Sequence, residues 1–355
     1  MWCSAWYDAS KQDFHHDRRR QPRVLSALML TPLIAVASFH ALVTLLHVFV
    51  PAISFDGYAC DSRGAPLKYR LNGAPLLLLT IAAFFLSPTA LQSYGARNWW
   101  ACVAASNGLG LFCSVLLMRL TPEPAFRCLT TDQKDLRERA AKGEKVSLPP
   151  APERNLAQHY FFGLAFNPRL FGVDLKMLLY ALGACALAWN TLSAMSLQAS
   201  PWPRALLVYA SLLFWFLLEY MCLECVHLYT YDLFCEKLGF KLCWGCLLFY
   251  PFFYCIGVWP LVLPEAASND ISRFTAIFIV VLFFCGWGLT RGANLQKYLY
   301  KRGLEHPLPI ISKFLASGNH TIPNTRLLCT GFWGLARHIN YCGEIVQAVA
   351  LALPG

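Results

Sequence analysis

Eight long apolar stretches follow one another along the chain, and they constrain its fold more than any other feature. They run over Val24–Val50, Pro75–Leu91, Trp99–Leu120, Leu175–Leu197, Pro203–Val226, Phe240–Leu263, Ile271–Thr290 and Ile339–Leu353. A helix needs about 20 mainly apolar residues to cross a bilayer, and most of these stretches are that long. Only 14% of the residues are charged, whereas a soluble domain carries about a quarter. The sequence therefore predicts an all-α fold, a polytopic transmembrane bundle of seven or eight helices.

The parts of the chain outside these stretches indicate a simple domain organisation. Residues 1–23 are an amino-terminal flank, with Arg18, Arg19 and Arg20 ahead of a first stretch that has no small-residue cleavage site and so resembles a spanning helix rather than a signal peptide. Residues 24–355 are expected to form one multi-pass membrane domain, in which 121–158 is a polar loop with charges of alternating sign.

The basic residues give a partial orientation. Most Lys and Arg lie in 52–74, 121–174, 227–239 and 291–326, which are therefore predicted to face the cytosol. The basic amino terminus then falls on the opposite side, so its orientation stays open. The net charge of +10 is spread over these loops rather than gathered in one patch, and nucleic-acid binding is not expected.

Four polar residues follow the fifth apolar stretch: Glu224, His227, Tyr231 and Asp232. Ionisable groups at membrane depth are costly and therefore candidates for function. On one continuous helix Glu224, His227 and Tyr231 would share a face, with Asp232 beside them. Such a cluster beside an apolar cavity could deliver a proton to a buried substrate. The alternative is a helix end that reaches the membrane interface, where Tyr and His are common.

Two cysteine pairs have the spacing of a zinc site. Cys222 and Cys225 form one pair, and Cys243 and Cys246 form the other. Both pairs lie in apolar helical runs, where small hydrophobic cysteines are ordinary and where the turns of a zinc knuckle are missing. No metal is therefore expected.

A basic and aromatic region follows the seventh stretch, over 291–302 and 326–344. Lys and Arg hold phosphate, and Trp or Tyr stack on a ring. The region therefore suits a phosphorylated aromatic cofactor, although the chain has no glycine-rich dinucleotide or P-loop motif. A basic loop that contacts lipid head groups is the alternative.

Six blocks of the sequence, in order, resemble the sterol reductase family. They are Leu67–Gly73, Tyr160–Arg169, His227–Asp232, Gly239–Gly245, Ala293–Lys297 and Gly331–Tyr341. This family includes the Δ14-sterol reductases, 7-dehydrocholesterol reductase, the C24(28)-sterol reductases and the reductase domain of the lamin B receptor. The sequences of 227–234 and 241–257 are most similar to the bacterial-type Δ14 branch. The resemblance implies reduction of a sterol carbon–carbon double bond with NADPH, without flavin or metal.

The resemblance also implies roles for individual residues. The NADPH contacts would be Lys297, Lys301 (where the family usually has arginine), Leu328, Trp333, Arg337, His338, Asn340 and Tyr341. The proton donor would come from Glu224 and Asp232, with Tyr231 and His227 nearby. Family members continue beyond the last block with another membrane segment and a tail, whereas this sequence ends at Gly355. The carboxy-terminal part of the family fold is therefore expected to be missing, which leaves stand-alone activity open.

The implied mechanism is protonation of one alkene carbon, followed by hydride transfer from NADPH to the other. The favoured substrate is a Δ14 sterol, and a Δ7-sterol reductase, a non-catalytic sterol-binding membrane protein and a membrane methyltransferase of the isoprenylcysteine type are the alternatives. The expected partners are a sterol and membrane lipid, and protein partners stay unknown. The expected location is the endoplasmic reticulum membrane of a eukaryote or the inner membrane of a bacterium.

Overall fold

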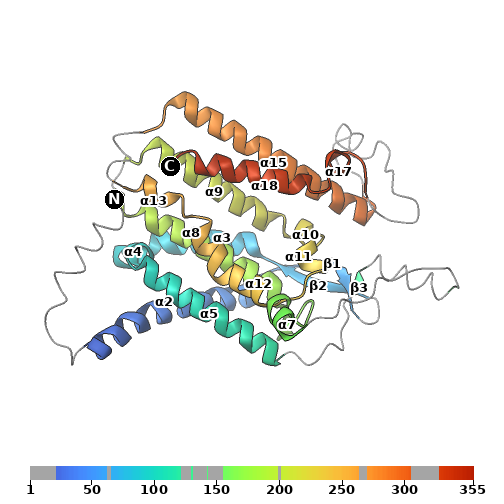
Figure 1. The fold of residues 1–355 in the computed structure, drawn as a ribbon, viewed down its shortest axis with the longest axis horizontal. Helices are drawn as coiled ribbons and strands as arrows, with labels where there is room; N and C mark the ends of the chain where they lie inside the picture. Colours follow the sequence, from blue (N-terminus) through green and yellow to red (C-terminus); the bar gives the residue numbers. More distant parts are fainter. Residues whose placement is uncertain are drawn as a thin grey trace.

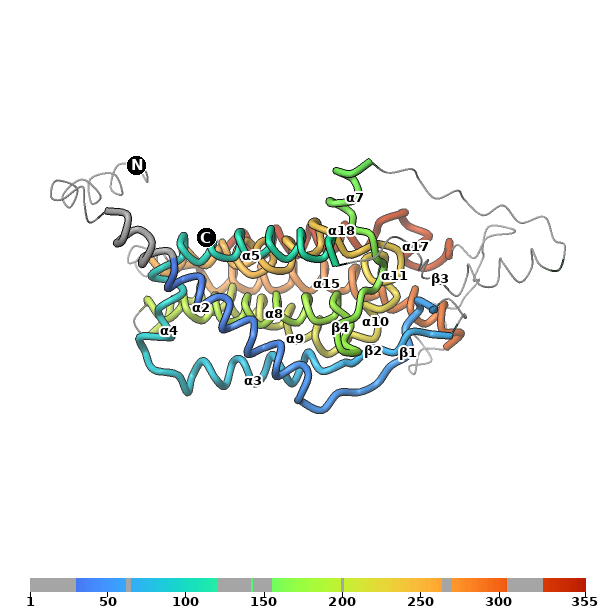
Figure 2. The backbone as a smooth tube through the Cα atoms, turned by 90° about the horizontal axis from the view of Figure 1, so that it is seen from below, coloured from blue at the N-terminus to red at the C-terminus, as the bar shows by residue number. Residues whose placement is uncertain are grey.

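A computed structural model gives the fold of the chain (Figures 1 and 2). It describes residues 21–61, 65–120, 129–130, 142, 155–198, 201–263, 270–304 and 328–355. Most of the amino-terminal flank and most of the predicted polar loop at 121–158 lie outside these residues.

Long helices form the body of the molecule (Figure 1). They are α2 (Gln21–Phe49), α3 (Gly73–Leu86), α5 (Trp99–Leu120), α8 (Leu175–Met195), α9 (Arg204–Cys222), α15 (Arg273–Arg302) and α18 (Ile339–Ala352). Of the described helices, six are long and apolar enough to cross a membrane. The predicted all-α polytopic membrane bundle is confirmed.

The predicted count of seven or eight spans becomes six or seven for two local reasons. The stretch Pro75–Leu91 is divided between α3 and α4 (Thr89–Arg97), which bend by 110° and make a seventh span only if counted together. Pro88 lies at this break, and the residue before a proline avoids helical geometry. Helix α18 has 14 residues, so it is about 21 Å long and shorter than the apolar core of a bilayer.

Helix α8 is the centre of the bundle, since 83% of its apolar window is buried, against 22 to 50% in the other spans. It packs against α2, α3, α4 and α9 and against η1 (Gly245–Phe253), a π-helix. Small residues allow this close packing: a Cβ on Gly183 would lie 2.5 Å from a ring carbon of Tyr250.

The predicted span Phe240–Leu263 is found as one of the six candidate spans, over Phe240–Leu261. It consists of three consecutive pieces, α12 (Phe240–Trp244), η1 and α13 (Val258–Leu261). Pro251 lies inside η1, where it cannot donate a backbone hydrogen bond. Asn190 of α8 donates from Nδ2 to the carbonyl of Pro251 at 2.9 Å. A neighbouring helix thus satisfies a backbone group near the break.

Helices α15 and α18 lie side by side along the outside of the bundle (Figure 1). Glycines permit the contact, because a Cβ on Gly343 would lie 2.5 Å from the carbonyl oxygen of Gly286. Helix α15 continues to Arg302, so the predicted change from span to basic loop after Thr290 is wrong for this part. The basic residues of this segment project from a rigid helix.

A small β-sheet caps one end of the bundle, where the sequence predicted a loop over 52–74. Strands β1 (Ile53–Cys60) and β2 (Pro66–Leu71) pair antiparallel with Ile53 opposite Leu71, and β1 also pairs with β3 (Leu129–Thr130). A second short ladder joins β4 (Arg169–Leu170) to β5 (Val173–Asp174). Both views place β1, β2, α10 (Glu224–His227), α11 (Tyr231–Phe234) and α17 (Phe332–Leu335) at this same end. Figure 2 shows α7 (Leu156–Phe162) projecting from the bundle near it.

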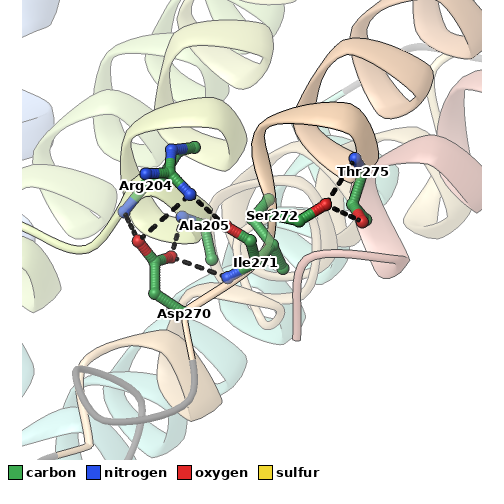
Figure 3. A network of polar contacts seen from close by, with 6 residues as sticks. All are labelled: Arg204, Ala205, Asp270, Ile271, Ser272 and Thr275. Carbon is green, nitrogen blue, oxygen red and sulfur yellow. Dashed lines mark hydrogen bonds and ion pairs between the residues drawn. The ribbon is translucent and has the colours of Figure 1, made fainter.

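A polar network closes the opposite end of α9 (Figure 3). Asp270 accepts hydrogen bonds from the backbone N–H groups of Arg204 and Ala205, each at 2.8 Å. Ser272 accepts from the N–H of Thr275 at 3.1 Å and so caps the start of α15. Because these caps satisfy donors that a helix start leaves unpaired, they fix the starts of α9 and α15 beside each other.

Candidate functional site

The predicted acidic residues lie where helix α9 ends, and the expected continuous helix through Tyr231 is wrong. Helix α9 stops at Cys222, α10 covers Glu224–His227, and a turn leads to α11. The backbone therefore changes direction, and the side chains separate. Glu224 and His227 are each only 5% exposed, whereas Tyr231 is 57% exposed and lies outside the buried cluster.

Glu224 is held by the start of α3. Its Oε2 accepts a hydrogen bond from the backbone N–H of Gly73 at 2.9 Å. Glycine leaves room for this contact, since a Cβ there would lie 2.7 Å from Glu224 Oε1 and the carboxyl would have to move. Burial raises the pKa of Glu224 to about 7, although the Gly73 N–H opposes the shift. The carboxyl therefore carries a proton much of the time near neutral pH.

A small pocket lies beside this carboxyl. It is lined by Met177, Tyr180, Tyr220, Met221, Glu224, His227 and Leu233, and its free volume is about 10 Å³. That is about the space of one water molecule, so part of a sterol could enter only if these side chains moved apart. Its walls are apolar and aromatic apart from the carboxyl and the imidazole.

His227 forms the second polar part of the pocket. Its ring stacks on Tyr220, with centroids 3.6 Å apart. Burial, and then the positive charge of Arg291, lower its pKa well below the usual value. Its Nε2 is buried and makes no hydrogen bond to any described residue. The imidazole is therefore neutral and has a nitrogen left to bind a water molecule or a ligand.

Asp232 is connected to the pocket by a hydrogen bond from Tyr180, a residue that the sequence analysis did not predict. Its Oδ2 accepts a hydrogen bond from the hydroxyl of Tyr180 at 3.2 Å, and Tyr180 lines the pocket. Tyr180 lies within the apolar stretch of α8, where a single tyrosine gives no functional signal. Only the packing of α8 against the segment after α9 brings the two together.

A buried ion pair joins the pocket to α15. Arg291 of α15 contacts the carboxylate of Glu219 on α9, and both side chains are less than a tenth exposed. Glu219 directly precedes Tyr220, the ring on which His227 stacks. The pair therefore places a neutralised cation behind the pocket wall.

The predicted cofactor lysines lie one turn apart on α15 and meet at one aromatic ring. Lys297 Nζ lies 5.3 Å and Lys301 Nζ 5.7 Å from the ring centroid of Phe234. Lys301 Nζ also lies 4.0 Å from the ring centroid of Tyr58 on β1. Neither aromatic residue was predicted to belong to the site. Phe234 comes two residues after the predicted acid Asp232, and Tyr58 lies in the segment 52–74 that was predicted to be a loop. We call Tyr58, Phe234, Lys297, Lys301 and Trp333 the basic-aromatic face.

Trp333 joins this face through α17. Its ring centroid is 5.8 Å from Lys297 Nζ, and its Nε1 donates to the carbonyl of Ala293 at 2.8 Å. Gln296 fixes the same loop by donating to the carbonyl of Thr330 at 2.9 Å and accepting from the N–H of Phe332 at 3.0 Å. Helix α15 thus holds the ring of Trp333 in place through its own backbone and one amide.

The remaining predicted cofactor residues lie on α18 or in the segment that leads to it. The carbonyl of Asn340 accepts from the hydroxyl of Thr290 at 3.0 Å. The rings of His338 and Tyr341 stack in parallel with centroids 5.3 Å apart, and both side chains are exposed. Arg337 is also exposed, and Leu328 is half-buried at the start of the described carboxy-terminal segment. Of these residues, Asn340 contacts α15, at Thr290, about two turns before Lys297.

The structure gives the cysteine pairs no common site. Cys222 is exposed at the end of α9, Cys225 is half-buried on α10, and Cys243 and Cys246 are buried on α12 and η1. Within the described ranges, no group of three or more His, Cys, Asp or Glu side chains is arranged to hold a metal ion.

Comparison with known proteins identifies the family. The sequence profile of the ergosterol biosynthesis ERG4/ERG24 family matches residues 24–355. The Delta(14)-sterol reductase of Methylotuvimicrobium alcaliphilum is 33% identical over 315 residues, which cover 87% of this chain and 67% of that protein. The Delta(14)-sterol reductase of Arabidopsis thaliana is 28% identical over 82% of this chain and 73% of its own length. The Delta(14)-sterol reductase LBR of Gallus gallus is 27% identical over 82% of this chain and 43% of its own length. The resemblance found in the sequence is confirmed, and the chain belongs to the ergosterol biosynthesis ERG4/ERG24 family.

Proposed function

We propose that this integral membrane protein reduces a carbon–carbon double bond of a sterol, the Δ14 bond, with NADPH as the hydride donor. One observation carries the proposal: a buried carboxyl, Glu224, lies in an apolar pocket at the end of the bundle that also bears the basic-aromatic face. The relatives named Delta(14)-sterol reductase support the substrate class and the bond.

The basic-aromatic face fits a phosphorylated dinucleotide in its chemistry. Two ammonium groups approach the same ring, that of Phe234, and their like charges would be offset by a phosphate between them. Trp333 offers an indole for stacking, and the exposed stacked pair His338 and Tyr341 offers a second aromatic surface. From residue 290 to residue 301, α15 rises about 16 Å, the length scale of an extended dinucleotide. When bound, NADPH would supply hydride.

Glu224 is the proton donor in this proposal. A general acid works best with a pKa near the working pH, and burial brings the pKa of Glu224 to about 7. The N–H of Gly73 would stabilise the carboxylate left after proton transfer, because it already points at Oε2. His227 is neutral and so supplies no proton of its own, but it can bind the water through which Glu224 recovers one.

The apolar walls serve the other half of the reaction. Protonation of a sterol alkene leaves positive charge on carbon, and water must be excluded from it. Met177, Met221 and Leu233 line the pocket. Their side chains carry only hydrocarbon and thioether groups, which react poorly with a carbocation. The aromatic faces of Tyr180 and Tyr220 can stabilise a nearby cation through their ring electrons. Asp232, bound to the Tyr180 hydroxyl, is the second candidate for supplying the proton.

We also propose that the pocket end of the bundle faces the cytosol, in the endoplasmic reticulum membrane of a eukaryote or the inner membrane of a bacterium. The basic residues gathered there support this orientation by the positive-inside rule. NADPH, a cytosolic cofactor, could then reach the basic-aromatic face directly.

Turnover of a Δ8,14-sterol with NADPH by the chain in detergent or liposomes tests the function. A Δ7 sterol and S-adenosylmethionine are run in parallel, to separate the Δ7-reductase and methyltransferase alternatives. The expected result is a product two mass units heavier with the Δ14 bond lost, formed about 10²-fold more slowly or slower still by Glu224→Gln. Sterol binding without turnover, and without NADPH binding, would instead indicate a non-catalytic sterol-binding protein.

A further inference from the structure

Lys176 is a buried cation that the proposed chemistry does not use. Its side chain is 1% exposed, and it is the second residue of α8. A cation near a helix start meets the positive end of the helix dipole, so this position is unfavourable for the helix itself. The surroundings of its Nζ must therefore account for it.

Three backbone carbonyls surround the ammonium group. Lys176 Nζ donates to the carbonyl oxygens of Asp232 at 2.8 Å and Leu233 at 3.2 Å, and also to that of Glu236. Helix α11 has four residues, so its last carbonyls have no partners along the helix. An ammonium has three donors and no fixed plane, which matches three carbonyls that converge from one segment.

The opposite side of Lys176 is fixed as well. Asp174 caps α8 by accepting hydrogen bonds from the N–H groups of Lys176 at 3.0 Å and Met177 at 3.1 Å. The carboxylate thereby orients the first turn of α8, from which the lysine side chain leaves. Asp174 therefore holds the start of α8, and Lys176, two residues later, holds the segment around Asp232 and Leu233.

The segment 232–236 carries parts of both halves of the site. Asp232 binds Tyr180 through its side chain, and Leu233 lines the acid pocket. Phe234 carries the ring that Lys297 and Lys301 both approach. Holding the carbonyls of this segment therefore fixes the wall of the pocket and the centre of the basic-aromatic face at once.

We propose that Lys176 is a positioning residue. By binding the carbonyls of segment 232–236, it fixes the position of the acid pocket relative to the basic-aromatic face. This role rests on the proposed function. It is distinct from a general contribution to stability, because it predicts a defect shared by both binding sites. A lysine that only stabilised the bundle would change the amount of folded protein and leave the affinities of the remaining molecules unchanged.

The test compares Lys176→Met, Lys176→Arg and the control Lys237→Met. Lys237 directly follows segment 232–236, and its Nζ lies over the ring of Phe166 at 5.3 Å. The measurements are kcat, KM for a Δ8,14-sterol, KM for NADPH, and hydrogen exchange of the amides in 231–236. Intrinsic fluorescence titrations give sterol and NADPH affinities that do not depend on turnover.

Lys176→Met should raise both KM values several-fold and lower kcat by about 10-fold or more, since small misplacements of reacting groups are costly. Exchange should accelerate in 231–236, and Lys237→Met should change none of these quantities. Lys176→Arg should lie between, because a planar fork keeps the charge but cannot face three carbonyls equally. Loss of activity only in proportion to folded protein, with both KM values unchanged, would overturn the role.

If Lys176→Met does not fold, Lys176→Arg decides the matter by the same two KM values, and parental values in a folded Arg variant overturn the role. If the parental chain turns over no sterol, the proposed function fails on its own. The exchange and titration data then decide on Lys176: faster exchange confined to 231–236 with weaker binding of both ligands supports it, and unchanged exchange refutes it.

Discussion

Replacing Glu224 by glutamine removes the proposed proton donor and changes little else. The amide has the shape of the acid, and its oxygen can still accept the hydrogen bond that the Gly73 N–H gives at 2.9 Å. We expect turnover of a Δ8,14-sterol to fall by about 10²-fold or more, the usual scale for a lost general acid. NADPH affinity should stay at the parental value, because the cofactor residues lie on α15, α17 and α18.

The pH profile makes the assignment specific. Burial raises the pKa of Glu224 to about 7, against the opposing hydrogen bond from Gly73. Only the protonated form can donate, so parental kcat should be level below pH 7 and fall about tenfold per pH unit above it. In Glu224→Gln, kcat should no longer fall above pH 7. If kcat of the variant still falls above pH 7, the proton comes from another group, and Asp232 would be the next candidate.

The same shift predicts a stability effect with a defined sign. A carboxyl whose pKa is raised on folding favours the folded state at low pH, and this contribution is lost as pH rises through the folded pKa. The rise from 4.5 to about 7 corresponds to about 3 kcal/mol, at about 1.4 kcal/mol per pH unit. The side chain is only 5% exposed, so solvent screening reduces this little.

Thermal unfolding in detergent at pH 5 and pH 8 measures that effect. Glutamine cannot ionise, so Glu224→Gln should match the parent at pH 5 and exceed it in Tm at pH 8. A parental Tm that instead rises between these pH values, with no change in the difference to the variant, would refute the reasoning about burial. The refutation would hold whatever the activity data show.

Three further predictions concern the cofactor face, the acid's backbone partner and the ion pair. Lys297→Ala and Trp333→Ala should each weaken NADPH binding in fluorescence titrations, by about 1.5–3 kcal/mol for the lost charge-assisted contact, and unchanged titrations would remove the nucleotide assignment. Gly73→Ala should lower turnover and move the pH limb, because its Cβ would lie 2.7 Å from the carboxylate that the glycine N–H binds; a parental pH profile would contradict this. Glu219→Gln should lower unfolding stability by about 3–5 kcal/mol, since it leaves Arg291 buried without an anion, and the double change Glu219→Leu with Arg291→Met should recover much of that loss in the same melting assay.

The sequence predicts the membrane bundle well because apolar length is a local property. A run such as Leu175–Leu197 can satisfy its backbone only as a helix in a bilayer, and α8 occupies Leu175–Met195. The breaks are less predictable, since apolar residues continue through them. Nothing in the composition of 240–263 distinguishes the π-helix η1 from a straight span; Asn190, far away in the chain, supplies the hydrogen bond that accompanies the break.

The site divides in the same way. Glu224, His227 and Lys297 could be predicted from residue type alone. Ionisable groups in an apolar stretch are costly, and clustered cations are typical of phosphate sites, so both indicate function. Their partners could not be found from the sequence, since the contact between Gly73 and Glu224 joins residues 151 positions apart. Tyr231 was expected beside Glu224 by helical spacing, and the end of α9 at Cys222 puts its side chain outside instead. Tyr180 on α8 is the tyrosine that lines the pocket.

The arrangement of charges explains how an acid with a raised pKa can lie at the same end of the bundle as the basic-aromatic face, the proposed cofactor site. A nearby cation favours the carboxylate and would lower the pKa of the acid, most strongly where the dielectric is low. The pKa of Glu224 is raised by burial and opposed by the Gly73 N–H, and no cation is among its causes; the ammonium groups of Lys297 and Lys301 lie over the ring of Phe234. Arg291, a buried cation behind the pocket, is paired with Glu219. Segment 232–236 therefore carries residues of two different electrostatic environments, one with a buried carboxyl of raised pKa and one with two lysines that we propose bind phosphate. Lys176 donates its hydrogen bonds to the carbonyls of that segment.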